Sequence, residues 1–103
     1  MKQKEATKIL ADSTVRVSEE QVSCDLGGES AILNLSNGVY YGLDPLGARI
    51  WELIQQPRTV NEVKDAILDE YDVEPDVAER DLVALLTHLS DEGLVQVGNA
   101  QSA

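Results

Sequence analysis

Short stretches of alternating apolar and polar residues follow the polar start of the chain. Val15 and Val17 alternate with polar residues, and Val22 and Cys24 repeat the same spacing a few residues later. This two-residue period is typical of a strand or of a bent pair of strands. We therefore expect extended structure between residue 14 and the Gly27-Gly28 pair.

A second pattern, in the segment AILNLSNGVYYGLD, places an apolar run on each side of Asn37-Gly38. The Asn-Gly pair favours a type I′ turn, whose twist matches that of two paired strands. The segment therefore predicts a β-hairpin with strands over residues 31–35 and 39–43.

Helical periodicity begins directly after the predicted hairpin. Asp44 can cap a helix, and Pro45 suits its first position. Thr59 and Glu62 have the spacing of a capping box, which predicts the start of a second helix. A third and longest helix is expected from Pro75 or Asp76 up to a C-terminal cap at Gly93, and LVQV reads as a last short strand.

This order of elements predicts an α+β, winged-helix-like fold with three helices, in which the hairpin forms the wing. With 103 residues, the chain has room for a single domain. We expect that domain to span residues 14–97, between flexible tails at 1–13 and 98–103.

Charge is distributed unevenly along the chain, which has a net charge of -11. From Asn61 to the C-terminus there are eleven acidic residues and only two basic ones, Lys64 and Arg80. Such a surface repels phosphate backbones and anionic membranes, so we expect no nucleic-acid or membrane partner. Solubility alone is an equally good explanation of the acidity.

The sequence offers little catalytic chemistry. It contains one histidine, His88, beside the apolar stripe of the third predicted helix, and one cysteine, Cys24, in a predicted strand. We expect Cys24 to be a buried thiol, in a reducing, cytoplasmic protein without a disulfide. These residues supply neither a metal site nor a nucleophile with its base, so the chain is not expected to be an enzyme or to need a cofactor.

The second strand of the predicted hairpin is instead a candidate for main-chain recognition. Residues 39–43, VYYGL, carry no charge, whereas exposed edge strands are usually protected by lysine, proline or a bulge. Such an edge can accept a foreign strand, unless another strand of the same chain covers it. A proline at Val39 or Tyr41 is expected to abolish such binding by removing a ladder donor.

Three segments, AILNLSNGVYYGLDPLGARIWELI, RTVNEVKDAILDEYDV and AERDLVALLTHLSDEGLV, together resemble the PqqD-like family of precursor-recognition domains. The resemblance covers residues 22–95 and is most specific at YYGLD and GARIWEL. It implies a compact winged helix-turn-helix domain with a three-stranded antiparallel sheet packed on three helices. It also implies binding of the leader segment of a ribosomally made precursor peptide, which is then presented to a separate processing enzyme. The stand-alone lasso-peptide type, whose partner is a cysteine protease, is the most similar subclass.

By position, the resemblance implies that the leader adds as a strand to the hairpin edge and lies against the third helix. The implied peptide-binding residues on the edge are Val39, Tyr40, Tyr41, Gly42 and Leu43. On the helix, the side away from the leucine stripe is expected to form the opposing wall, and its residues are Arg80, Val83, Ala84 and Thr87. Tyr40 and Tyr41 point to opposite faces, and the sequence leaves open which one lines the groove.

Two other functions remain open at this point. A winged-helix outline is also found in DNA-binding regulators, although the acidic third helix disfavours phosphate contacts. The family resemblance also allows a PqqD-type chaperone that serves a radical SAM enzyme.

Overall fold

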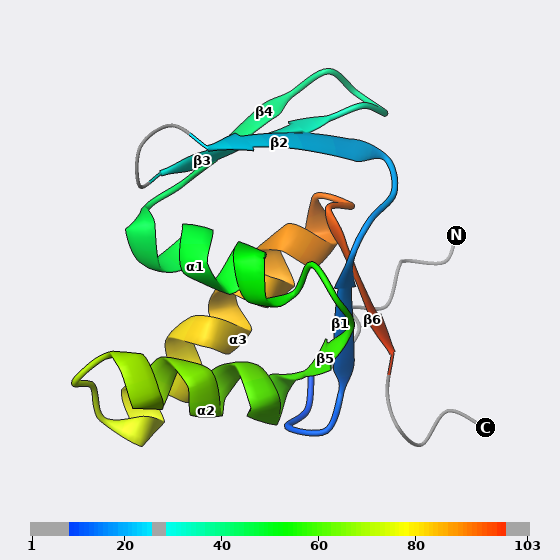
Figure 1. Ribbon diagram of the computed structural model, residues 1–103. Coiled ribbons are helices and arrows are strands. Elements are labelled where there is room, and N and C mark those ends of the chain that lie inside the picture. Colours follow the sequence, from blue (N-terminus) through cyan, green and yellow to red (C-terminus); the bar gives the residue numbers. More distant parts are fainter. Residues whose placement is uncertain (1–8, 26–28, 99–103) are drawn as a thin grey trace.

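Two small antiparallel sheets and three helices build the protein, as the computed structural model shows for residues 9–25 and 29–98 (Figure 1). The elements follow in the order β1 (Thr14–Val17), β2 (Gln21–Asp25), β3 (Ser30–Asn34), β4 (Tyr40–Leu43), α1 (Pro45–Leu53), β5 (Arg58–Thr59), α2 (Val60–Glu70), α3 (Pro75–Asp91) and β6 (Val95–Gly98). The predicted α+β class with three helices and a three-stranded antiparallel sheet is therefore confirmed.

One sheet has the strand order β2-β3-β4, and the other has the order β5-β1-β6. The second sheet was not expected from the sequence, because its strands come from three distant parts of the chain. β1 pairs with β6 through Val15 and Val97, and with the two-residue strand β5 through Val15 and Arg58. The pairing brings both ends of the described chain together beside the helices (Figure 1).

The hairpin β3–β4 is present, but the predicted type I′ turn is wrong. Gly38 has a φ of 73°, whereas Asn37 does not have a positive φ. The backbone N–H of Asn34 donates to the carbonyl of Val39 at 2.9 Å, which leaves four residues in the loop. Side-chain oxygens explain this longer loop, because Asn34 accepts from the Ser36 N–H and Asn37 from the Val39 N–H.

Local capping signals place the helices as expected. The Asp44 carboxylate accepts from the N–H of Gly47 at 2.8 Å at the start of α1. Thr59 and Glu62 form a reciprocal capping box at the start of α2. α3 ends at Asp91, and the φ of 75° at Gly93 permits the N–H of Leu94 to donate to the Leu89 carbonyl, as in a Schellman motif.

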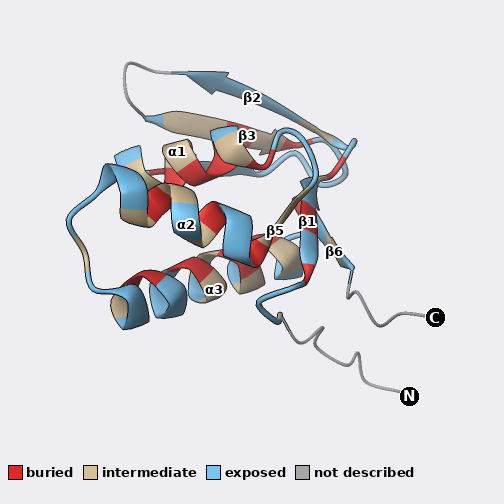
Figure 2. Cartoon of the chain, turned by 60° about the horizontal axis from the view of Figure 1, so that its bottom comes forward, coloured by how far each residue is buried: buried red, intermediate tan, exposed pale blue. Residues whose placement is uncertain are grey.

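The core lies between the three helices and the inner faces of both sheets (Figure 2). Apolar side chains from every layer meet there, since Ile32 of β3, Ile54 after α1, Val63 of α2 and Leu86 of α3 are fully buried. Cys24, which we expected to be buried, is exposed instead. It lies on β2, a terminal strand of its sheet, where neither face of the strand is enclosed.

Residues 9–13, which fall within the predicted N-terminal tail, contact the folded part. Ala11 and Ser13 accept backbone hydrogen bonds from Asn61 and Val60 at the start of α2, each at 2.9 Å. The division into a domain and two tails stays a prediction, because residues 1–8 and 99–103 lie outside the described residues.

Candidate functional site

β4 is the terminal strand of the sheet β2-β3-β4, so one of its edges has no strand partner among the described residues. In Figure 1 this strand borders the sheet on the side where the chain turns into α1. The strand carries no charged residue, and no bulge is described in its ladder with β3. β4 therefore has the properties of an edge that can accept another strand.

The register of the ladder shows which main-chain groups point away from β3. Asn34 and Val39 are joined by a hydrogen bond, and the antiparallel pairs continue as Leu33–Tyr40, Ile32–Tyr41 and Ala31–Gly42. Hydrogen-bonded and non-bonded pairs alternate in such a ladder. The N–H and C=O groups of Tyr41 therefore point toward β3, whereas those of Tyr40 and Gly42 point away from it, toward the open edge.

This geometry changes the expected effect of proline. The N–H of Val39 is already bonded to the Asn37 side chain, and the pairing of Tyr41 with Ile32 directs its N–H toward β3. Proline at these positions would disturb the hairpin rather than the open edge. The informative positions are Tyr40 and Gly42.

An open cavity of about 760 Å³ lies beside β4 and is lined by residues of all three helices. Its lining is largely apolar, with contributions from Leu43 of β4, Ile50 of α1, Ile67 of α2 and Leu85 of α3. A strand added to β4 would therefore have an apolar recess next to it, of a kind that holds side chains of a bound peptide.

Tyr41 belongs to this cavity and Tyr40 does not. Tyr41 pairs with the buried Ile32 on the core side of the sheet, and its ring lies 5.1 Å from the ring of His88 on α3, centroid to centroid. Burial, and then the negative charges of Glu92 and Asp44, raise the pKa of the Tyr41 hydroxyl above its ordinary value. Tyr40 is 68% exposed on the opposite face.

The predicted site residues are only partly brought together. Tyr41, Gly42, Leu43 and Ala84 all line the cavity. Val39 and Tyr40 lie on the same hairpin outside this lining, and the predicted helix positions Arg80, Val83 and Thr87 also lie outside it. Whether these residues contact a peptide stays a prediction.

The side of α3 that faces β4 is formed by Asp81, Ala84, Leu85 and His88 instead. The spacing of these positions places them on one helix face, about 100° from the centre of the predicted one. Leu85 is half-buried and packs against the core from this face. The i, i+4, i+7 spacing of Asp81, Leu85 and His88 is the signal that could have identified this face.

All charged side chains that line the cavity are acidic, namely Asp44, Asp72 and Asp81. Asp44 also caps α1, whereas no ion pair joins Asp72 or Asp81 to another described residue. The rim of the cavity therefore carries negative charge that a bound cationic group can neutralise.

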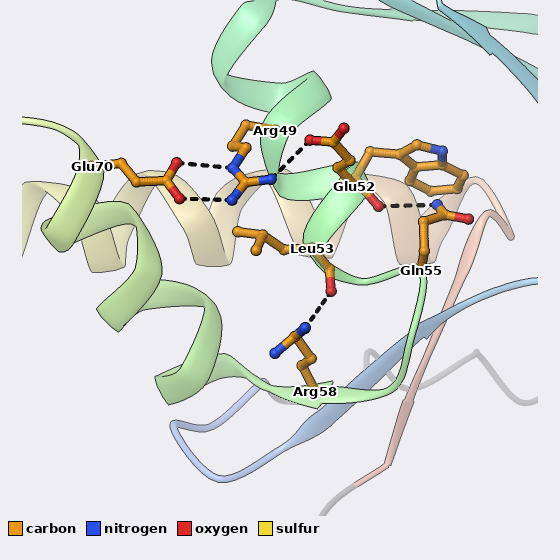
Figure 3. A network of polar contacts seen from close by, with 7 residues as sticks. Arg49, Glu52, Leu53, Gln55, Arg58 and Glu70 are labelled. Atoms are coloured by element: carbon orange, nitrogen blue, oxygen red, sulfur yellow. Dashed lines mark hydrogen bonds and ion pairs between the residues drawn. The ribbon is translucent and has the colours of Figure 1, made fainter.

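A polar cluster joins α1 to α2 (Figure 3). Arg49 of α1 donates to both carboxylate oxygens of Glu70 of α2, at 2.8 and 2.7 Å, and also to Glu52. The guanidinium lowers the pKa of the Glu70 carboxyl below its usual value. This two-point contact fixes the relative position of the helices that supply Ile50 and Ile67 to the cavity.

Among the described residues, no helix has the length and apolar character required to cross a membrane. No group of three or more potential metal ligands occurs in this part of the chain either. The site is thus an uncharged strand edge beside an apolar cavity with an acidic rim.

Comparison with known proteins gives a consistent result. The family described as coenzyme PQQ synthesis protein D (PqqD) matches residues 29–95. No curated protein matches the chain. The solved structure of TbiB1 in complex with the TbiA(β) leader peptide is 37% identical, with a TM-score of 0.75, and the match covers 79% of this chain and 94% of that one.

Two further structures are similar. Lasso peptide synthetase B1 complexed with its leader peptide is 27% identical, with a TM-score of 0.72, and the match covers 80% of this chain and 96% of that one. The PqqD part of Methylobacterium extorquens PqqCD, described as a stand-alone RiPP recognition element, has a TM-score of 0.75 over 90% of this chain and 99% of that one. At 17% identity, this last similarity shows a shared fold alone.

Proposed function

The chain belongs to the PqqD family, and from this membership we propose that it binds the leader segment of a ribosomally made precursor peptide and presents it to a separate processing enzyme. The observation that carries the proposal is the open edge of β4 beside the cavity. The leader adds to β4 as a further strand, and main-chain hydrogen bonds to Tyr40 and Gly42 hold it there. The chain itself catalyses no step.

Side chains of the added strand would alternate between the two faces of the sheet. Those on the inner face enter the cavity beside Tyr41, Leu43 and Leu85, where apolar residues are favoured. The acidic rim favours a basic residue next to the apolar ones. Of the residues predicted from the sequence, Tyr41, Gly42, Leu43 and Ala84 are best placed for contact, whereas Arg80, Val83 and Thr87 lie away from the cavity lining.

Presentation then works through proximity. A leader that is disordered in solution becomes ordered on the sheet edge, while the core segment of the precursor stays attached and mobile. An enzyme that also contacts the chain meets this core segment at an effective concentration in the millimolar range, on the order expected for a short flexible linker.

Processing in a lasso-peptide pathway is the specific form that we favour, with a leader-removing cysteine protease as the enzyme. The support comes from the leader-bound lasso peptide synthetase B1 at 27% identity and the leader-bound TbiB1 at 37%, against 17% for the PqqD part of PqqCD. The strand-addition geometry is the same for a PqqD-type chaperone, so this subclass assignment depends on sequence similarity rather than on the site.

Strand addition can be tested with a fluorescently labelled leader of the cognate precursor, with the TbiA(β) leader as the first probe. Gly42→Pro removes one outward donor and leaves a carbonyl of the leader unpaired, which costs about 1–3 kcal/mol. We therefore expect binding to be weaker by about tenfold or more in fluorescence anisotropy titrations. Proline is tolerated on an edge strand where its nitrogen faces solvent, so the fold should persist.

Gly42→Ala is the matched control, because it retains the N–H group and its Cβ would meet no atom within 4 Å. We expect this variant to bind as the parent chain does. Equal affinities for the proline and alanine variants would contradict main-chain pairing at β4. A parent chain that binds no cognate leader would contradict the proposed function itself.

A further inference from the structure

Positive and negative charges are separated along the chain. Residues 1–8, MKQKEATK, lie outside the described residues and contain three of the eight basic residues of the chain against a single acid. We call residues 1–8 the basic segment. The chain as a whole nevertheless has a net charge of -11, so the part that follows the basic segment is strongly acidic. The basic segment is therefore attracted to carboxylates of the folded part that have no cation beside them.

The acidic rim of the cavity offers such carboxylates. Asp72 and Asp81 line the cavity, are exposed, and form no ion pair with another described residue. Elsewhere the acids are already paired, as Glu70 is with Arg49 on the joined helices α1 and α2. None of the described residues that line the cavity is basic. The rim is thus a place where a lysine from another segment finds two unpaired carboxylates.

The basic segment is long enough to reach this rim. The residues that follow it are attached to the start of α2, where the N–H of Asn61 donates to the Ala11 carbonyl at 2.9 Å. α2 has 11 residues, so its far end, which Asp72 follows, is about 17 Å away. Residues 1–8 span up to about 26 Å when they are extended. Lys2 and Lys4 can therefore lie at the rim while Ala11 stays in place.

Further carboxylates lie between the attachment point and the rim. Asn61, Asp65 and Asp69 follow one another at intervals of four residues, so they lie along one side of α2. Asp65 and Asp69 are exposed and form no ion pair with another described residue. Lys8 is the lysine closest in sequence to the attachment point and is suited to these two acids. Lys2 and Lys4 then remain for the rim.

The open edge of β4 is a second reason for a cover. Exposed edge strands are usually protected against unwanted pairing, most often by lysine, whereas β4 has no charged residue of its own. The cavity that carries the acidic rim lies directly beside this edge, because Tyr41 and Gly42 belong to its lining. A lysine-rich segment held at the rim supplies the missing protection from a distant part of the chain.

We propose that the basic segment occupies the acidic rim of the cavity when no leader is bound, so that the chain regulates its own leader site by competition; this inference rests on the proposed function. The lysine ammonium groups contact Asp72 and Asp81, and the segment lies across the entrance to the cavity beside β4. Surface ion pairs are individually weak, so the occupancy is partial and a leader displaces the segment. The apparent affinity for the leader is reduced in proportion to the fraction of chains whose rim is free.

A full-length variant with an uncharged segment tests the competition. Lys2→Gln, Lys4→Gln and Lys8→Gln together should bind the labelled TbiA(β) leader about threefold more tightly than the parent chain, which corresponds to a rim that is occupied in about two thirds of parent chains. Anisotropy titrations at about 10 mM salt measure this gain, because the screening length there is about 30 Å. At about 1 M salt, where the screening length is about 3 Å, the variant and the parent chain should bind equally.

Lys2→Arg, Lys4→Arg and Lys8→Arg together are the matched control, because this variant retains the three positive charges. It should bind the leader as the parent chain does. Unchanged or weaker leader binding by the glutamine variant would overturn the proposal, since lysines that do not compete have no effect and lysines that contact the leader have the opposite one.

A double-mutant cycle separates contact at the rim from the general effect of charge on a basic leader. On a background with Asp72→Asn and Asp81→Asn, the three glutamine substitutions should give no further gain in leader affinity. A threefold gain that persists on this background would show long-range repulsion alone and would overturn the proposal.

A measurement without leader distinguishes failure of this inference from failure of the proposed function. In two-dimensional amide NMR spectra, the signals of Asp72, Asp81 and Leu85 should differ between the parent chain and the glutamine variant, whereas that of Ser23 on β2 should not. Identical rim signals would overturn the inference. A parent chain that binds no leader rejects the proposed function, and rim signals that still respond would then show that the basic segment occupies the rim.

Discussion

Asn34 connects the hairpin to the end of α3 through its side chain. Its amide nitrogen donates to the Glu92 carbonyl at 2.8 Å, and its amide oxygen accepts from the Ser36 N–H at 2.9 Å, while the residue is almost completely buried. Asn34 therefore fixes both the loop before β4 and the distance of that strand from α3. The position of the binding edge depends on this one side chain.

Asn34→Ala should destabilise the fold, because it removes the partner of the Glu92 carbonyl and of the Ser36 N–H from two partly buried hydrogen bonds. The expected loss is about 1–3 kcal/mol, measured by urea denaturation. Asn37→Ala is the matched control, since Asn37 makes a similar bond to the Val39 N–H at an exposed position where water can replace it. A loss of equal size in the two variants would contradict the role of Asn34 as a buried connection.

The raised pKa of Tyr41 predicts that the stability of the fold decreases at alkaline pH. The raised pKa of its hydroxyl means that the unfolded chain releases this proton first, so the tyrosine stabilises the fold at neutral pH and this contribution is lost as pH rises above about 10. Tyr41→Phe should therefore flatten the decline of stability above that pH. Thermal melts of the parent chain and the variant from pH 8 to 11 measure the effect.

At the scale of elements, local signals predicted beginnings and ends well. Asp44, Pro45, Thr59 and Gly93 act through atoms within a few residues of themselves, so the sequence contains all the information that their roles need. The type I′ turn predicted after Asn34 is wrong because local sequence does not contain all the information that this turn needs. Its conformation depends on a buried side chain that bonds to Glu92, 58 residues further along the chain.

Contacts between distant parts of the chain explain the other two differences between the sequence prediction and the structure, namely the strand β5 and the face of α3 that meets β4. The strand β5 has only two residues, too few for any period, and exists because β1 lies beside it. The face of α3 that meets β4 is likewise decided by how the helix packs on α2 and β6. Periodicity identifies residues that share a helix face, but it does not say which neighbour that face meets.

Two variants of α3 separate the predicted wall from the observed one. Leu85 lines the cavity and Val83 does not. Leu85→Ala should weaken leader binding by roughly tenfold through lost apolar contact, whereas Val83→Ala should leave it nearly unchanged. Leader titrations by isothermal calorimetry measure both. The reverse result would restore the wall that was expected from the sequence.

For the whole molecule, leader binding should appear as added stability. A strand on β4 bridges the hairpin and the helices, and it has no counterpart in the unfolded chain. At a leader concentration 100 times its Kd, the folded state gains about 2.7 kcal/mol. That gain should raise Tm by roughly 10 °C or more in a chain of this size.

Differential scanning fluorimetry measures this shift, with Gly42→Pro as the matched control. That variant should show a much smaller increase at the same leader concentration. Because the effect depends only on occupancy, it also reveals whether a candidate leader is recognised before any enzyme has been identified. A parent chain whose Tm does not respond to a saturating leader would contradict a bridging role.

The outward N–H and C=O groups of Tyr40 and Gly42 have a consequence for how precursors diverge. Every leader residue except proline offers the same N–H and C=O groups, so the main-chain part of the interaction does not depend on the side chains of the leader. Only every second residue of an added strand reaches the cavity, which leaves the residues between free to vary as far as this chain is concerned. A single copy of the protein can thus serve a set of precursors that share a spaced pattern of a few side chains and little else.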